Sequence, residues 1–349
     1  MIRLQVLRAN QGDCIILSYG IKATNNHIII DGGMGKECYR QLQKFLCDIK
    51  LHNENVELLI LTHFDKDHIS SFLDIMKDDS IDISIIKMIW FNYGTQLSNE
   101  LKKYKSLQLF IKEASKQTSV AQGEEFYIKI QKKDILLNSY IKELDCYEVR
   151  GAKITILSPS INQLEELVDE IGTSDGIGTE LEENNHLKQT AASRSDYNDC
   201  VDDLLKMKYS EKGVSVANRS SIAFLFEYDD KKIMILGDAV SSQIIKALET
   251  IGYSKDNPIK LYFYKIAHHG SSHNTSPELI QMIDCSRYII SSNWTCNRPS
   301  KTCLSRIIAN SDKPITFYCN YQYKNIFTED EKIRYNVSFE LIDGAGMLL

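Results

Sequence analysis

The chain has 349 residues, of which 43% are hydrophobic and 25% are charged, and this balance is typical of a soluble globular protein with a large core. Its formal net charge of -6 argues against a dedicated nucleic-acid-binding domain, because such domains usually carry a basic surplus that neutralises phosphates. Nine cysteines without a C-x-x-C pair favour reduced thiols and argue against a zinc ribbon. We find no signal peptide and no apolar run of membrane-spanning length, so we expect a cytoplasmic protein without a membrane partner.

Residues 1–93 contain short apolar runs that end in turn residues, as β-strands do. Five runs predict strands by alternation or by continuous apolar character, namely 2–7, 14–19, 27–33, 56–63 and 86–93. After His68 the apolar residues recur at helical spacing, so a helix is expected to start near Asp67. The polar end of the fourth run therefore lies at a strand-to-helix junction.

The middle of the chain differs in composition from both ends. Residues 99–144 are rich in lysine and broadly helical in pattern, which is typical of the exposed side of an amphipathic helix, with a nucleic-acid-binding face as the alternative. The run 152–160 predicts a strand again. Residues 160–215 are acidic, with glycine, serine and asparagine interspersed, and we predict an inserted helical segment or lid there that could dock a protein partner. We expect the whole chain, 1–349, to form one domain around this insertion.

Strand patterns return in the last third of the chain. Six runs predict them, at 221–228, 233–239, 261–266, 287–293, 315–320 and 336–342. Strand patterns at both ends with helical patterns between them predict an α/β fold in which two strand-rich halves are covered by helices.

Three of the predicted strands end in side chains that can bind a metal. These side chains are His63, Asp65, Asp67 and His68 after the first, Asp238 after the second, and His268 and His269 after the third. Loops at the ends of strands are where a rigid sheet builds a site, and a catalytic metal needs several converging nitrogen and oxygen ligands with one open position. We therefore predict a metal site, and Asp238 is the natural candidate to bridge the ions if two are bound.

The ordered motifs THFDKDH, ILGDA and AHHGSSHNTS resemble those of the metallo-β-lactamase superfamily, whose signature is HxHxDH, a later Asp after a strand, and a terminal His. Within that superfamily the chain is similar to the ComEC-like branch, the hydrolase domain of bacterial DNA-uptake channels and its stand-alone relatives. This closer resemblance rests on ANQGDCIILSYG, HIIIDGG, KITILSPS and NRSSIAFLFEYDDKKIMILGDA, and it covers about 1–95, 145–160 and 215–300. It implies a four-layer αββα sandwich with the metals at one edge of the two sheets.

The chain departs from the family signature at two positions. Asp65 stands where the second histidine is expected, and Asn218 is the nearest match to the histidine of the third motif. The resemblance then implies a first site of His63, Asp65 and Asp238 with Asn218, which is rich in oxygen and favours Mn²⁺ or Mg²⁺ over Zn²⁺. The second site, which suits Zn²⁺ or Mn²⁺, consists of Asp67, His68, Asp238 and His268. One or two ions are both compatible with this pattern.

Neighbouring residues receive supporting roles. We assign His268 as the ligand and His269 as a proton donor or substrate contact, with the reverse assignment as the alternative. Asp67 is expected to take part in catalysis, although an acidic residue at a helix start also complements the helix dipole. Carboxylates commonly orient metal-bound histidines, and we assign this role to Asp13 and Asp31. The equally supported alternative is that each of them only forms a tight turn beside a glycine. Two further residues, Ser271 and His273, follow the two histidines of the last motif and are assigned to substrate contact, with exposure to solvent as the alternative for His273.

These features predict a metal-dependent hydrolase in which a metal-bound hydroxide attacks the substrate. The resemblance and the oxygen-rich ligands favour a phosphodiesterase or nuclease that acts on nucleic acid or nucleotides. A metallopeptidase or amidohydrolase on the same fold is the first alternative. An inactive binding module is the second, because two expected histidines are replaced. Fold alone does not choose among substrates.

Overall fold

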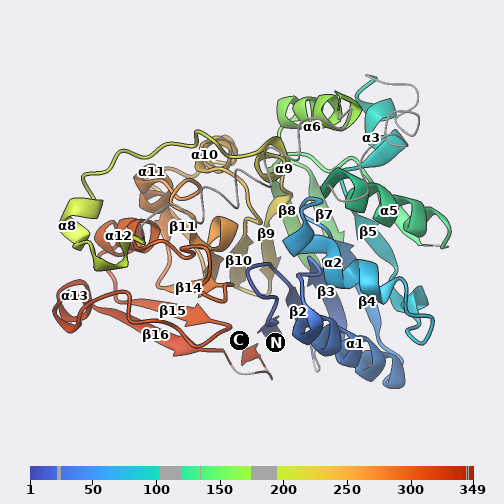
Figure 1. Cartoon of the computed structure of the whole chain (residues 1–349), viewed down its shortest axis with the longest axis horizontal. Helices are drawn as coiled ribbons and strands as arrows, with labels where there is room; N and C mark the ends of the chain where they lie inside the picture. Colours follow the sequence, from blue (N-terminus) through green and yellow to red (C-terminus); the bar gives the residue numbers. More distant parts are fainter. Residues whose placement is uncertain (22–24, 103–118, 134, 174–194, 343, 345) are drawn as a thin grey trace.

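The computed structural model in Figure 1 describes residues 1–21, 25–102, 119–133, 135–173, 195–342, 344 and 346–349. Within these residues the strands form two large sheets and one short pair. The seven-stranded sheet contains, in spatial order, β17 (Met347–Leu348), β1 (Ile2–Val6), β2 (Ile15–Tyr19), β3 (Asn26–Ile30), β4 (Asn55–Ile60), β5 (Met88–Trp90) and β6 (Leu136–Asn138). The eight-stranded sheet contains β16 (Val337–Leu341), β15 (Ile315–Cys319), β14 (Arg287–Ile290), β12 (Phe263–Lys265), β10 (Lys231–Ile235), β9 (Ala223–Tyr228), β8 (Ala152–Ser158) and β7 (Cys146–Val149). The short pair is β11 (Ile259–Lys260) and β13 (Ile283–Asp284).

Helices cover the outer faces of both sheets (Figure 1). The longer ones are α1 (Lys36–Leu51), α2 (Lys66–Ile75), α3 (Gly94–Glu100), α5 (Ser119–Gln131), α6 (Ile161–Thr173), α10 (Ser241–Thr250), α12 (Lys301–Ala309) and α13 (Glu329–Tyr335). The shorter ones are α8 (Val201–Leu204), α9 (Val216–Arg219) and α11 (Pro277–Gln281), with 3-10 turns η1 (Ile83–Ile85), η2 (Asp196–Asn198) and η3 (Ala267–Gly270). No described helix is long and apolar enough to cross a membrane.

Three groups of buried apolar side chains hold the layers together. The group between the sheets includes Leu17 and Ile60 from one sheet and Phe224 from the other. A second group packs α1, α2 and α5 against the outer face of the seven-stranded sheet, and a third packs α10, α11 and α12 against the other sheet. Full burial of one such side chain contributes about 1.5–3 kcal/mol, so these three interfaces dominate the stability of the fold. The order of layers is helix, sheet, sheet, helix, which confirms the predicted αββα sandwich.

Parallel pairing brings several strand ends to one edge of the sandwich. Strand β3 pairs in parallel with β4, and β10 pairs in parallel with β12. Their carboxyl ends lead into Asp31, Thr62, Asp238 and His268, respectively. The loop between β1 and β2 reaches the same edge, where an added Cβ on Gly12 would lie 1.8 Å from the Asp67 carbonyl oxygen. Only glycine allows this approach, which places the next residue, Asp13, beside α2.

The strand predictions agree with the structure, whereas several helices, among them α1, α12 and α13, were not predicted. All five apolar runs of residues 1–93 and the run at 152–160 contain strands, but residues 36–51 between them form α1. The Lys-rich segment 99–144 contains the helix α5 and also the strand β6, and residues 103–118 of it lie outside the described residues.

The predicted insertion at 160–215 is described at both ends, since residues 174–194 lie outside the described part. It begins with α6 and continues through η2 and α8. Its second half packs on the same chain, because the Asp196 carboxylate accepts hydrogen bonds from the Lys301 and Thr302 N–H groups at 2.9 and 2.8 Å. Asp202 also forms an ion pair with Arg334 at 2.8 Å.

Candidate metal centre

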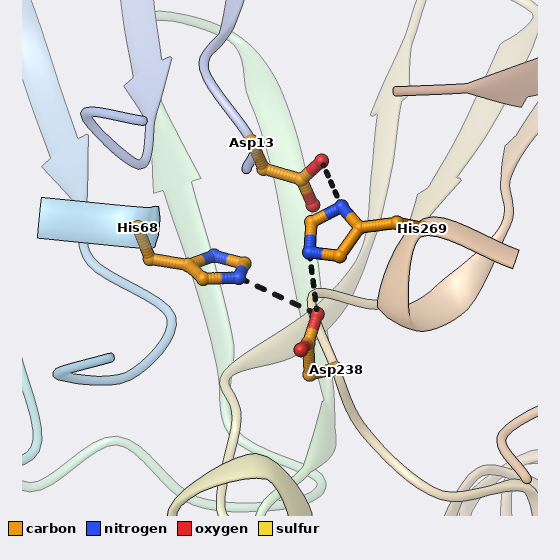
Figure 2. Close-up of side chains that lie close together, drawn as sticks. All are labelled: Asp13, His68, Asp238 and His269. Carbon is orange, nitrogen blue, oxygen red and sulfur yellow. Dashed lines mark ion pairs between the residues drawn. The ribbon is translucent and has the colours of Figure 1, made fainter. Parts of the chain in front are cut away.

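Four buried side chains from separate segments converge at the edge where the strand ends meet. They are Asp13, His68, Asp238 and His269, and each offers one ligand atom such that all four atoms lie within 4.8 Å of one another (Figure 2). None of the four residues is more than 2% exposed. The first comes from the β1–β2 loop, the second from α2, the third follows β10 and the fourth lies in the turn after β12.

Four imidazoles at this edge are held in a common way. Each is anchored through Nδ1, with His68 against Asp31 Oδ2 at 2.7 Å, His269 against the Ser291 carbonyl at 3.1 Å, His63 against Ser221 Oγ at 3.1 Å and His268 against Asn274 Oδ1 at 2.8 Å. A hydrogen bond at Nδ1 fixes the ring and leaves the Nε2 lone pair for a metal.

Several atoms at the centre of the site are buried without a hydrogen-bond partner. Among the described residues these include Nε2 of His63, His68 and His269 and Oδ1 of Asn218 and Asp238. A buried polar atom without a partner costs about 1–3 kcal/mol, and such atoms are normally rare. Their convergence, and their identity as imidazole nitrogens and carboxylate or amide oxygens, fit a bound divalent metal.

One group of atoms gathers on the Oδ1 side of Asp238. This oxygen lies 3.5 Å from His68 Nε2 and 3.8 Å from His269 Nε2. Asp67 completes the group, because its Oδ2 lies 3.5 Å from His269 Nε2 and 3.9 Å from His68 Nε2. We call these four residues, Asp67, His68, Asp238 and His269, the α2-side group.

A second group gathers on the Oδ2 side of Asp238. That oxygen lies 3.3 Å from His268 Nε2, which also lies 3.3 Å from Asn218 Nδ2. His63 Nε2 and Asp65 Oδ2 lie 3.5 Å apart, and the His63 and His68 rings are 4.1 Å apart. We call His63, Asp65, His268 and Asn218, with Asp238, the α9-side group. Asp238 Oδ1 therefore faces His68 and His269, whereas Asp238 Oδ2 faces His268.

The electrostatics of the site are set by close pairs of opposite charge. Burial acts to raise the pKa of Asp238, but His268 and His68 outweigh it and hold the pKa well below its usual range. Burial acts to lower the pKa of His68, but Asp238, Asp31 and Asp67 raise it well above its usual value. The pKa of His269 is also raised, because Asp13 and Asp238 outweigh its burial. By contrast, burial and the positive charge of Arg298 lower the pKa of His268.

Two buried carboxylates lie behind the α2-side histidines. Asp31 accepts hydrogen bonds from Thr62 N and Thr62 Oγ1 at 2.7 and 2.8 Å while it contacts His68. Asp13 accepts a hydrogen bond from the fully buried Lys265 ammonium, and its other oxygen lies 3.4 Å from His269 Nδ1. Burial acts to raise the pKa of Asp13, but Lys265 and His269 hold it well below its ordinary value.

The structure distributes the predicted site residues differently from the sequence assignment. His269, assigned to proton donation, lies in the α2-side group, while His268, assigned to that group, contacts Asn218 on the opposite side. Asp65 occupies the N-cap position of α2 but makes no capping hydrogen bond, so its carboxylate is directed to His63 instead.

Two predicted residues make their side-chain hydrogen bonds outside the group of converging atoms. His273 Nδ1 bonds to the Ser210 carbonyl at 2.8 Å, and Ser271 Oγ accepts a hydrogen bond from the His273 N–H at 3.3 Å. Sequence reasoning missed Lys265, Ser221 and Asn274. Only Lys265 carried a signal, since a lysine at the end of the apolar run LYFYK is unusual for a buried strand.

A family model described as the metallo-beta-lactamase superfamily matches residues 11–176. This match spans Asp13, Asp31 and the whole HxDxDH segment. No curated protein sequence matches the chain significantly. The match covers part of the chain, and together with the converging imidazole and carboxylate atoms it supports a metal-dependent hydrolase.

Several solved structures are similar at low identity. Yeast PDE1 is 11% identical with a TM-score of 0.45, and the match covers 99% of each chain. A long form of RNase Z from yeast is 12% identical with a TM-score of 0.39, covering 84% of this chain and 36% of that one. CmlA, a diiron β-hydroxylase from Streptomyces venezuelae, is 9% identical with a TM-score of 0.39, and the match covers 88% of this chain and 49% of that chain. The chain thus spans about half the length of the CmlA structure, and similarities this low carry no inference about function.

Proposed function

From the metallo-β-lactamase superfamily match and the two sets of converging ligand atoms, we propose that the chain is a metal-dependent phosphodiesterase that acts on nucleic acid or nucleotides. The observation that carries this proposal is the position of Asp238, whose Oδ1 faces His68 and His269 and whose Oδ2 faces His268. Such an arrangement suits a pair of divalent ions, which commonly serve phosphoryl-transfer sites.

The two groups differ in the ligands they would offer. The α2-side group would hold one ion through Asp67, His68, Asp238 and His269. The α9-side group would hold the other through His63, Asp65, Asp238 and His268, with Asn218 beside it. Mixed imidazole and carboxylate ligands suit Mn²⁺ or Zn²⁺, and the carboxylates also allow Mg²⁺. When bound, such ions supply an activated water and stabilise charge on the phosphate oxygens.

The chain's own residues would orient these ions and the substrate. Asp67 cannot act as a proton donor at neutral pH, because His68 and His269 outweigh the effect of its burial and hold its pKa well below the usual value. As a carboxylate it can bind a metal or accept a hydrogen bond from water. Asp65 and Asp67 have side chains that are 28% and 20% exposed, whereas the four histidine side chains are at most 8% exposed. Substrate would therefore approach from the N-terminal end of α2.

Metal reconstitution tests the proposal directly. The stripped protein would be given Mn²⁺, Mg²⁺ or Zn²⁺ separately and assayed on single-stranded DNA, duplex DNA, RNA and bis(p-nitrophenyl) phosphate. We expect cleavage that depends on the metal and is lost in Asp238→Ala. The matched control is Asp230→Ala, since the side chain of Asp230 is 89% exposed and pairs only with its neighbour Lys231 among the described residues.

Other outcomes distinguish the alternatives. If metal binds tightly through Asp238 but no phosphodiester is cleaved, peptide and amide substrates become the next class to assay. If no metal binds, only a binding module on the same fold remains. The proposed role of residues 160–215 as a lid or protein-docking segment is separate, and deletion of 174–194 followed by the same assays would test it.

A further inference from the structure

A short segment beside the site, residues 293–298, has an unusual backbone. Trp294, Cys296 and Asn297 have φ values of 62°, 55° and 53°, in the left-handed region that residues other than glycine rarely occupy. Each such residue costs on the order of 1–2 kcal/mol, so surrounding contacts must hold the segment in place. A backbone strained at several positions beside an active site is an observation from which a functional role can be inferred.

The contacts that hold this segment come from several directions. Ser292 Oγ donates a hydrogen bond to the Arg298 carbonyl at 2.8 Å, and the Arg298 N–H donates to the Thr295 carbonyl at 3.1 Å. Lys324 Nζ donates to the Trp294 carbonyl at 3.0 Å. The main chain of Arg298 is thus fixed on both sides of its Cα.

The two residues that follow this segment, Pro299 and Ser300, pack directly on the histidine turn of the site. The Ser300 N–H donates to the Gly270 carbonyl at 2.9 Å, and an added Cβ on Gly270 would lie 2.4 Å from Pro299 Cβ. Gly270 has a φ of 86°, so both its conformation and the lack of space require glycine. Arg298 therefore begins next to the turn that carries His268 and His269.

The Arg298 side chain carries a positive charge into this region. It is partly buried, and the main chain of Arg298 lies one residue before Pro299, which packs against Gly270 of the histidine turn. No carboxylate among the described residues forms an ion pair with it, in contrast to Arg150, Arg219 and Arg334, which pair with Glu57, Glu166 and Asp202.

A phosphodiester substrate needs such a charge at this site. The carboxylates of Asp65, Asp67 and Asp238 face the centre and cancel much of the charge of any divalent ions they bind. Lys265, the buried cation nearby, is already paired with Asp13. An anionic substrate therefore gains most from a cation that lies at the rim and has no carboxylate partner there, and a guanidinium fork matches the two non-bridging oxygens of a phosphate.

We propose that Arg298 binds the phosphate group of the substrate at the rim of the site, beside His268. This inference rests on the proposed phosphodiesterase function and deepens it, because it names the phosphate anion as the group recognised and Arg298 as the residue that recognises it. Arg298 is a specificity residue in this role and does not hold the metal.

The test compares Arg298→Gln and Arg298→Lys with the wild-type chain, all loaded with Mn²⁺. Arg334→Gln is the matched control, since it removes one positive charge from the exposed helix α13. Calorimetry would measure binding of inorganic phosphate, and kinetics would follow bis(p-nitrophenyl) phosphate and the uncharged ester p-nitrophenyl acetate. Chelator competition would measure metal affinity independently of any activity.

We expect Arg298→Gln to weaken phosphate binding by roughly 10- to 100-fold, the range for loss of charge-assisted hydrogen bonds. KM for the phosphodiester should rise by a similar factor, while kcat/KM for the uncharged ester and the metal affinity stay within about two-fold of wild type. The phosphate affinity of Arg298→Lys should lie between those of the wild type and Arg298→Gln, because lysine keeps the positive charge but lacks the two parallel N–H donors of the guanidinium. The control should match wild type in every assay.

Two results would overturn the inference. One is unchanged phosphate binding in Arg298→Gln. The other is a parallel loss of metal affinity, which would mean that Arg298 acts through the ligands. If the wild-type chain cleaves no phosphodiester at all, the proposed function fails, yet the phosphate-binding measurement still decides whether Arg298 is an anion site.

Discussion

The two sides of the candidate metal centre present the same kind of atom but support it differently. On the α2 side, His68 lies against the Asp31 carboxylate, and His269 Nδ1 donates to the Ser291 carbonyl with Asp13 Oδ1 3.4 Å away. On the α9 side, His63 and His268 lie against the neutral Ser221 hydroxyl and Asn274 amide. A carboxylate behind an imidazole raises its basicity as a ligand, whereas a neutral group only orients the ring. We therefore expect the α2 side to bind its ion more tightly.

Removal of one histidine from each side gives the largest contrast. His269→Asn should remove the ion of the α2 side and His268→Asn that of the α9 side, so each variant should bind one ion fewer than wild type at saturating Mn²⁺. The ion that remains should bind tightly in His268→Asn and weakly in His269→Asn. Metal analysis and chelator competition measure both quantities, with the exposed His52→Asn as control. Equal affinities in the two variants would contradict the comparison.

The division of these two histidines between sides could not be read from the sequence. Both have left-handed backbones, with φ values of 50° and 55°, and this turn alone decides which ring faces which group. The motif spacing did identify the residues that meet at the strand ends, because parallel strands bring His63, His68 and Asp238 to one edge. The orienting residues are different: Lys265 meets Asp13 across 252 positions of the chain, and no local pattern carries such a pair.

The sequence pattern also predicts some elements of the fold and misses others. Continuous apolar runs predict the buried strands, since burial on both faces leaves a direct trace in the sequence. Helix α1 was not expected, because its buried residues, Cys38, Leu42, Leu46 and Ile49, are separated by polar residues and include a cysteine. Its apolar spacing of three or four residues was nevertheless present and fits one helical face.

The two carboxylates behind the α2-side histidines have different partners. Asp13 pairs with the buried ammonium of Lys265, whereas Asp31 accepts hydrogen bonds from the uncharged Thr62. Lys265→Met should destabilise the metal-free protein by about 3–5 kcal/mol, because it leaves the Asp13 charge buried with only His269 beside it. The double variant Lys265→Met with Asp13→Asn should recover most of that loss, since neither partner is then charged. Urea denaturation in EDTA measures all three proteins. No recovery in the double variant would show that packing, rather than charge, is what Lys265 contributes.

The orienting groups themselves should have unequal effects on metal binding. Asp31→Asn should weaken Mn²⁺ binding on the α2 side by roughly 10- to 100-fold, as is typical when the outer partner of a metal-bound histidine is removed. Ser221→Ala should weaken binding on the α9 side by less than that. Because Ser221 Oγ also accepts the Asp238 N–H, this second variant should cost about 1–3 kcal/mol of stability. Chelator competition compares the two, and a larger affinity loss in Ser221→Ala would reverse the ranking.

The smallest effect is on the pH dependence of the metal-free protein, and it has opposite signs on the two sides. The raised pKa values of His68 and His269 mean that folding favours their protonated forms, so this contribution is complete below pH 6.5 and is lost as pH rises through the raised values. The lowered pKa of His268 has the reverse effect, since its contribution is present above pH 6.5 and is lost as pH falls through the lowered value.

In EDTA, the melting temperature should therefore decrease as pH rises above 6.5, because His68 and His269 are the two of these three histidines that still titrate there. Each unit of pKa shift corresponds to about 1.4 kcal/mol. Saturating metal should reverse the trend, because a metal binds only the deprotonated imidazoles and binding gains from a rise in pH. Asp31→Asn should flatten the EDTA curve by lowering the pKa of His68, whereas Asp48→Asn on the exposed side of α1 should leave it unchanged. A melting temperature that rises with pH in EDTA would mean that the carboxylates do not hold these histidines in the protonated form, and the expected difference in metal affinity would lose its physical basis.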